Sequence, residues 1–201
     1  MATIKELHPA FQHSHYIFRR KVFKLFGGAF HVYDKYGKPL FYSEQKAFKL
    51  REDFRVYSDE RQTEELLTIK TPEILDIGAT YNVQDATTGE AIGAIRRKGI
   101  KSIIKDEWIF LSNEGQEVGK LTESSMAGAL LNRFIDLWFF NLVPQTYVIT
   151  STGGRKIAEI KQHFNPFVLK YSMTIVELEP SIDRRLLISA GILLAGIEHG
   201  Q

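Results

Sequence analysis

The chain has 201 residues, of which 44% are hydrophobic and 25% charged, and its net charge is +2 at pH 7. These values suit one soluble domain with a substantial core, and the charge is too small to indicate a nucleic acid partner. The absence of cysteine excludes disulfides, thiolate metal sites and a cysteine nucleophile, and it fits a reducing cytoplasm. We therefore expect a single cytoplasmic domain over residues 1–201.

The N-terminal residues 1–15 are mostly polar and are expected to form an arm. They lack a basic stretch followed by an apolar one, so no signal peptide is expected. His8, His13 and His15 lie in this arm, but no carboxylate or cysteine completes a ligand set for a metal ion. We expect neither a metal nor another cofactor.

Short runs rich in Phe, Tyr, Val and Ile alternate with polar turns from residue 16 to residue 178, which predicts about a dozen strands. Four copies of a strand–turn–strand unit have Gly with Asp or Asn in the turn, and they span residues 30–43, 80–98, 108–124 and 146–163. Further strands are expected at Tyr16–Lys24, Glu44–Leu50, Phe54–Tyr57, Leu66–Thr71 and Phe167–Leu178. So many short strands favour a barrel or a sandwich over an α/β fold.

The last three copies share a pattern after the turn glycine. Two aliphatic residues stand three positions apart, with a small residue after the first, as in Ile92-Gly93-x-Ile95, Val118-Gly119-x-Leu121 and Ile157-Ala158-x-Ile160. A spacing of three breaks the alternation of a strand. It predicts a β-bulge that bends each strand, as the closure of a barrel requires.

Residues 125–141 are predicted to form a helix, because their apolar residues recur at helical spacing. Trp138, Phe139 and Phe140 give this helix an aromatic load that suits contact with a partner protein or with a membrane surface. The alternative is a helix that packs over the mouth of the barrel.

The segment Leu186–Ile197 predicts a second helix, with Ser181 or Asp183 as the N-cap. Its 12 residues give about 18 Å of helix, whereas the hydrocarbon core of a bilayer is about 30 Å thick. The segment is apolar on nearly all sides and must be buried on nearly all sides. A β-rich chain that ends in such a helix suggests a sheet wrapped around it.

The densest run of positive charge follows residue 95 and is a candidate for binding a lipid headgroup or another anionic ligand. It comprises Arg96, Arg97, Lys98, Lys101 and Lys105. The alternative is a solvated strand edge, where Lys discourages pairing with other chains. A second candidate cluster comprises Arg19, Arg20, Lys21 and Lys24.

Three segments resemble a known superfamily: VYDKYGKPLFYSEQKAFKL, YNVQDATTGEAIGAIRRKGIKS followed by Trp108, and MTIVELEPSIDRRLLISAGILLAG. They are similar to the LURP-one-related and phospholipid-scramblase group, which shares the tubby C-terminal fold. The resemblance covers about residues 16–198. It implies a mainly β fold, with a closed antiparallel barrel of about twelve strands around a central hydrophobic C-terminal helix.

The resemblance also implies phosphoinositide binding in some relatives. The chain departs from many eukaryotic scramblases, since it lacks their cysteine cluster and has no match to their acidic calcium-binding segment before the final helix. The helix predicted at 125–141 looks like an insertion relative to the family pattern.

We therefore expect a non-enzymatic binding domain that recognises an anionic phospholipid, a membrane surface or a small ligand at the barrel rim. One alternative is a scaffold or interaction protein that contacts a partner or a second copy through the aromatic helix. A further alternative is a phospholipid scramblase. No set of nucleophile, base and oxyanion donors can be assembled from the sequence, so no enzyme is expected.

Overall fold

The computed structural model describes residues 7–21, 29–45, 53–71, 78–98, 107–124, 144–163, 165 and 168–197. These residues form twelve strands, one 3-10 helix and one α-helix. The elements in chain order are η1 (Pro9–Gln12), β1 (His15–Lys21), β2 (Ala29–Tyr33), β3 (Pro39–Gln45), β4 (Asp53–Tyr57), β5 (Glu65–Lys70), β6 (Thr80–Asp85), β7 (Ala91–Arg97), β8 (Glu107–Ser112), β9 (Glu117–Glu123), β10 (Thr146–Ser151), β11 (Lys156–His163), β12 (Val168–Ile175) and α2 (Arg184–Ile197).

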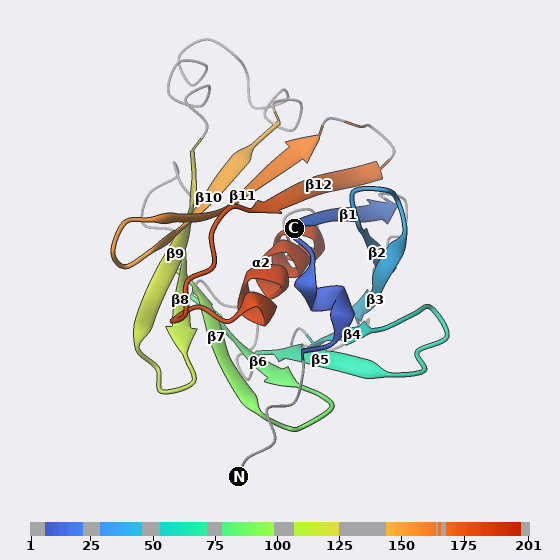
Figure 1. The fold of residues 1–201 in the computed structure, drawn as a ribbon, viewed down its shortest axis with the longest axis horizontal. Coiled ribbons are helices and arrows are strands. Elements are labelled where there is room, and N and C mark those ends of the chain that lie inside the picture. The colour runs from blue at the N-terminus through green and yellow to red at the C-terminus, as the bar shows by residue number, and fades with distance from the viewer. Residues whose placement is uncertain are drawn as a thin grey trace.

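The strands form one closed antiparallel barrel in which each strand pairs with its neighbours in sequence. The ring closes where β1 pairs with β12, in a register that sets His15 opposite Thr174 and Lys21 opposite Val168. Along β12 buried and partly exposed residues alternate, because one face of a strand points into the barrel and the other outward. The expected fold class is confirmed, with α2 in the middle of the ring (Figure 1).

β-bulges occur where the repeat pattern predicted them. In five hairpins of the described chain, the second strand carries one residue more than its partner. The extra residues are Leu40, Leu66, Ile92, Val118 and Ile157, and all five are buried. The last three confirm the prediction from the spacing of three. A bulge increases strand bending and twist, which helps a sheet to close on itself.

Each turn before these bulges begins with an Asp or Ser whose side-chain oxygen accepts hydrogen bonds from one or two backbone N–H groups of the turn. In the first, the Asp34 carboxylate accepts hydrogen bonds from the backbone N–H groups of Tyr36 and Lys38, both at 2.8 Å. Each turn then reaches a residue with positive φ, which is Gly37, Gly89, Gly115 or Gly154 in four of them. The β4–β5 turn uses Gln62 instead, at φ 57°. That turn has no glycine signal, so the sequence did not reveal it as a copy of the unit.

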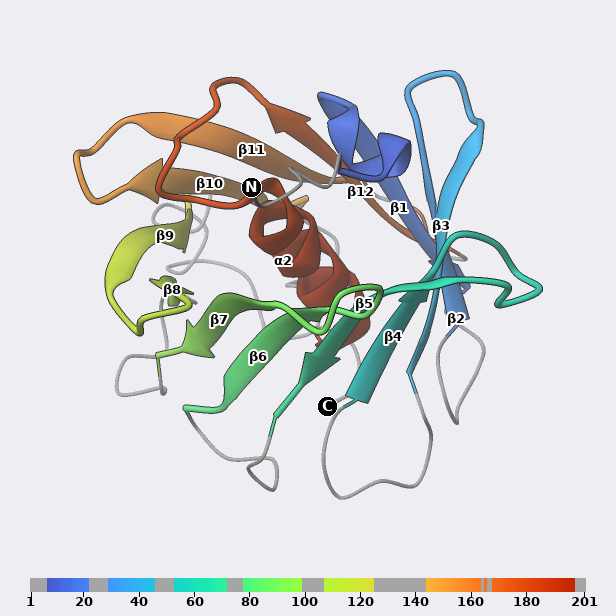
Figure 2. The same cartoon turned by 60° about the horizontal axis from the view of Figure 1, so that its bottom comes forward.

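The helix α2 fills the barrel. Its residues from Arg185 to Ile197 are all buried, and Figures 1 and 2 show strands around it on every side. The backbone N–H of Arg185 donates to the Asp183 carboxylate at 2.8 Å, which confirms Asp183 as the N-cap. We call the barrel end where α2 begins the proximal end and the opposite end the distal end. In the described part of the chain, no helix is long and apolar enough to cross a bilayer.

Part of the arm expected over residues 1–15 is packed. In η1, Phe11 is 2% exposed, and its ring centroid lies 4.9 Å from that of Phe41. Tyr16 donates its hydroxyl to the Ala10 carbonyl at 3.2 Å. Burial raises the pKa of Tyr16 to about 12, although the nearby Arg184 acts in the opposite direction. The phenol therefore stays protonated and holds η1 against the barrel.

Two expected elements fall partly or wholly outside the described residues. The strand expected at Glu44–Leu50 overlaps only the end of β3, which is described to Gln45. The helix expected at 125–141 lies outside the described residues.

Candidate functional site

The predicted basic run begins at the distal end of the barrel. The helix begins beside the β6–β7 turn, where Arg185 contacts Asp85 and Glu90. β7 then runs from that turn for about 20 Å, which is close to the length of α2, and ends at Arg97. The Arg96–Lys105 run therefore starts where α2 ends.

Arg96 and Arg97 lie on opposite faces of β7. Arg96 is exposed and stands opposite Thr80 and Ile109, on the outside of the barrel. Arg97 is two residues after Ile95, which is fully buried, so its side chain is turned toward the barrel interior. The strand is hydrogen-bonded to β6 on one side and β8 on the other. The alternative of an unpaired strand edge therefore does not apply to these two arginines.

Arg97 lies over an aromatic pair at the distal mouth. Its guanidinium carbon is 5.5 Å from the centroid of the Trp108 ring, and the Tyr81 and Trp108 centroids are 6.0 Å apart. Trp108 is 2% exposed, and its indole Nε1 has no hydrogen-bond partner among the described residues. A buried N–H donor without an acceptor costs about 1–3 kcal/mol. An incoming oxygen atom that accepted this hydrogen bond would remove that cost.

Of the other site residues predicted from the sequence, one forms an ion pair and the rest lie outside the described chain. Lys98 donates to Glu107 across the β7–β8 pair at 3.2 Å, which offsets its charge. The others are Lys101, Lys105, Trp138, Phe139 and Phe140, which all lie outside the described residues.

The two arginines of the second basic cluster, Arg19 and Arg20, lie in different surroundings. Arg19 points outward and is exposed, whereas Arg20 donates to the carbonyls of Ala195 and Gly196 at 3.3 and 2.6 Å. Burial lowers the pKa of Arg20. A cation at a helix C-terminus satisfies carbonyls that have no partner within the helix and interacts favourably with the helix dipole. Arg20 therefore anchors α2 rather than presenting a charge to a ligand.

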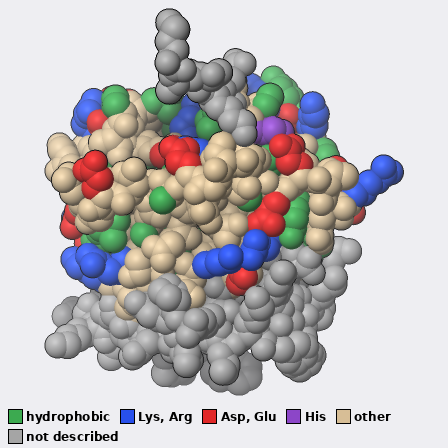
Figure 3. Space-filling view, turned by 90° about the horizontal axis from the view of Figure 1, so that it is seen from below, with side chains coloured by type: hydrophobic (Ala, Val, Ile, Leu, Met, Phe, Trp, Pro, Cys, Tyr) green, Lys and Arg blue, Asp and Glu red, His purple; other side chains and the backbone are tan. Residues whose placement is uncertain are grey.

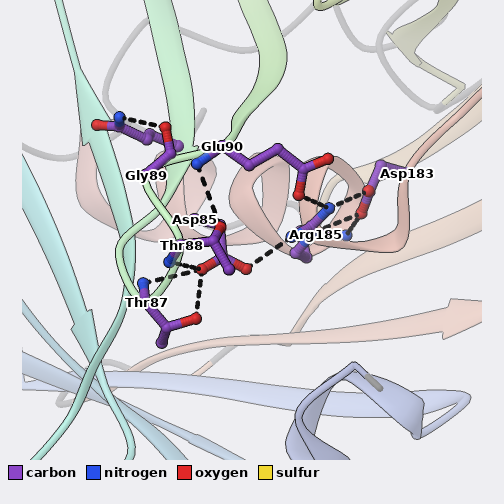
Figure 4. A network of polar contacts seen from close by, with 8 residues as sticks. Asp85, Thr87, Thr88, Gly89, Glu90, Asp183 and Arg185 are labelled. Carbon is purple, nitrogen blue, oxygen red and sulfur yellow. Dashed lines mark hydrogen bonds and ion pairs between the residues drawn. The ribbon is translucent and has the colours of Figure 1, made fainter. Parts of the chain in front are cut away.

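The proximal end holds a charge network that sequence reasoning missed (Figure 4). Arg185 is 8% exposed and donates to Asp85 and Asp183 at 2.7 Å and to Glu90 at 3.2 Å. Burial acts to raise the pKa of Asp85, but hydrogen bonds from Thr87 and Arg185 outweigh this effect and lower it. Each charge has a partner, so we interpret the network as a structural link between α2 and the β6–β7 turn. Only the neighbouring charges in Asp183-Arg184-Arg185 could have hinted at it.

The molecular surface shows no broad single-sign patch on the face seen in Figure 3, where acidic and basic side chains of the described residues intermingle. Among those residues there is also no group of three or more His, Asp or Glu side chains that could hold a metal ion. At the distal mouth, the Trp108 indole can donate a hydrogen bond and the Arg97 guanidinium provides positive charge.

Comparison with known proteins identifies a family. The sequence matches the family model described as LURP-one-related over residues 40–195, which is well over half of the chain. None of the curated proteins compared with the chain matches it.

Proposed function

Since the chain belongs to the LURP-one-related family, we propose that it is a non-enzymatic binding domain that recognises an anionic group at the distal mouth of its barrel. The group is a lipid headgroup or a small anionic ligand. This proposal keeps the expectation from the sequence and narrows it to Arg96, Arg97 and the surroundings of Trp108.

The observation that carries the proposal is the buried indole N–H of Trp108 beneath the Arg97 guanidinium. The indole N–H can donate a hydrogen bond, and the Arg97 guanidinium, which has other contacts of its own, adds positive charge beside it. Their natural complement is therefore an oxygen with negative charge. Arg96 adds a second cation at the same end of the barrel, and it takes part in none of the ion pairs between described residues.

A vesicle assay tests the proposal. Sedimentation with vesicles that contain anionic phospholipid should show binding that weakens as salt rises and with the exposed change Arg96→Glu. The matched control is Arg61→Glu, which makes the same charge change on an exposed arginine in the β4–β5 turn at the proximal end. Equal loss in both variants, or binding that ignores salt, would contradict a specific site at the distal mouth.

The indole proton gives a second test that also covers soluble ligands. The chain has two tryptophans, so the variant Trp138→Phe leaves Trp108 as the source of the remaining indole signal in an NMR spectrum. A soluble anionic headgroup such as glycerol phosphate should shift this signal, and Arg97→Lys should weaken the effect because Lys lacks the planar fork. An unmoved indole signal at saturating ligand would count against the site.

The alternatives drawn from the sequence concern other parts of the chain or other activities. Contact with a protein partner or a second copy through Trp138, Phe139 and Phe140 stays a prediction, because these residues lie outside the described chain. A position at a membrane surface belongs to the vesicle test above. No observation on the described residues favours lipid scrambling.

A further inference from the structure

A cluster of hydrogen-bond donors lies on the outside of the barrel across three adjacent strands. It comprises Lys161 and His163 of β11, Lys170 and Ser172 of β12, and Arg19 of β1. These residues alternate with the buried Ile160, Leu169, Tyr171 and Phe18, so their side chains point away from the core. Sequence separation hid the cluster, because Arg19 and Lys170 come from opposite ends of the chain.

The strand registers bring the cluster together. Lys170 stands directly opposite Arg19 on one side and His163 on the other, and Ser172 stands opposite Lys161. Neighbouring strands are about 4.8 Å apart, so the row from His163 to Arg19 spans about 10 Å. The His163 Nε2 and the Ser172 hydroxyl are 2.7 Å apart.

Positive charge in this cluster is only partly balanced. Glu159 contacts Lys161 and Lys156, and Arg19 lies 5.8 Å from the centroid of the Tyr33 ring. Neither Arg19 nor Lys170 contacts a carboxylate in the part of the chain that the structure describes. Like charges directly opposite each other destabilise a sheet, so fold stability does not account for this pair.

The pKa of His163 depends on the electrostatic potential of this cluster. Burial lowers its pKa, and the charges of Lys170 and Lys161 lower it further. The imidazole is therefore mostly neutral at pH 7, and an anion between the cations would raise its pKa.

We propose that the cluster of Lys161, His163, Lys170, Ser172 and Arg19 binds a phosphate monoester group. The cations supply charge, the Ser172 hydroxyl and His163 supply directed hydrogen bonds, and Arg19 offers a planar fork that suits phosphate. This site is separate from the distal mouth, because four strands lie between β12 and β7 along one side of the ring and six along the other. It does not depend on the function proposed above.

The pKa of His163 provides the test. Inorganic phosphate is titrated into the protein at constant ionic strength, with chloride as the control anion, while NMR follows the histidine ring signals. We expect the pKa of His163 to rise by about one unit, while His8 and His13, which precede β1, serve as internal references. The double variant Arg19→Gln, Lys170→Gln should lose this rise, and Lys120→Gln, at an exposed site on β9, should keep it.

Thermal unfolding gives a second readout that also checks folding. Phosphate should raise the Tm of the unmodified protein but not of the double variant. Without phosphate, the double variant should unfold at the same or a higher temperature.

Glycerol phosphate and vesicles that contain phosphatidic acid then distinguish a soluble ligand from a lipid headgroup. The proposal is overturned if phosphate leaves the pKa of His163 unchanged or shifts it equally in the double variant. Arg96→Glu should not alter the shift, so failure at the distal mouth and failure here are distinguishable.

Discussion

Two glycines of α2 show how single residues allow a helix to fit inside the barrel. A glycine inside a helix costs roughly 0.5–1 kcal/mol relative to alanine, so Gly191 and Gly196 weaken α2 as an isolated helix. A Cβ atom at Gly191 would lie 2.3 Å from the Phe18 ring, and one at Gly196 would lie 2.4 Å from the Phe54 ring. These rings point inward from β1 and β4, so the glycines accommodate the barrel wall.

Adding a methyl group at either position should destabilise the fold. We expect Gly191→Ala and Gly196→Ala each to lower the free energy of unfolding by about 1–3 kcal/mol, because the buried rings must shift. Denaturant unfolding measures the change. The control is Gly153→Ala, where the new Cβ would lie 3.7 Å from Ser151 Oγ in ordinary contact. A helix-glycine variant as stable as this control would contradict the packing argument.

At the scale of elements, the link between α2 and the β6–β7 hairpin depends on Arg185. The helix and hairpin are far apart in sequence, and this buried cation joins them through Asp85 and Glu90. A buried charge is tolerated when it is paired and hydrogen-bonded, but removing one partner leaves the others without compensation. The network therefore fixes where the helix begins relative to the strands.

Replacing Arg185 should have a large, pH-dependent effect. We expect Arg185→Met to cost about 3 kcal/mol at pH 7 in denaturant unfolding. The pKa of Asp85 is lowered in the folded protein, so its contribution is present above its unfolded pKa of about 3.9 and is lost as pH falls through the lower folded value. The difference between the variant and the unmodified protein should therefore shrink below about pH 4.

The control for this prediction is Arg155→Met. Arg155 also pairs with two carboxylates, Glu177 and Glu179, but it is 55% exposed. Exposed ion pairs contribute about 0–1 kcal/mol. Similar losses in the two variants would show that burial of Arg185 does not matter.

At the scale of the whole molecule, the barrel and the helix depend on each other. The seven large apolar side chains of α2 are at most 5% exposed, and burying them contributes on the order of 10–20 kcal/mol before opposing terms. They are Leu186, Leu187, Ile188, Ile192, Leu193, Leu194 and Ile197. The inward faces of the strands would be equally exposed to water without the helix.

Removing the helix should therefore abolish folding. A chain that lacks residues 183–201 is expected to lose the dispersed NMR spectrum of a folded protein. The single change Ile188→Asp, at a fully buried position, should have the same effect, because an unpaired charge cannot be accommodated there. Val176→Asp, at a position that is 54% exposed, should be tolerated. A well-folded truncated chain would show that the strands can form the barrel alone.

Much of the architecture could be predicted because its signals are local. Glycine after a polar turn, an aliphatic spacing of three and a short apolar helix flanked by charges each reflect backbone geometry or burial within a few residues. Gln62 was missed because an L-residue there adopts positive φ without the glycine signal. The face of β7 on which Arg96 and Arg97 each lie depends on strand alternation. A shift of one residue in the strand register would exchange their faces.

The sequence by itself determined the strand-rich character, the bulges and a C-terminal helix that must be buried, since each follows from short-range periodicity and hydrophobicity. The tertiary structure alone decided which distant side chains meet. Lys170 faces Arg19 because β12 closes the ring against β1, and Arg185 reaches Asp85 because α2 enters the barrel beside that turn. Strand pairing and helix docking join residues far apart in the chain, so no local pattern encodes these contacts.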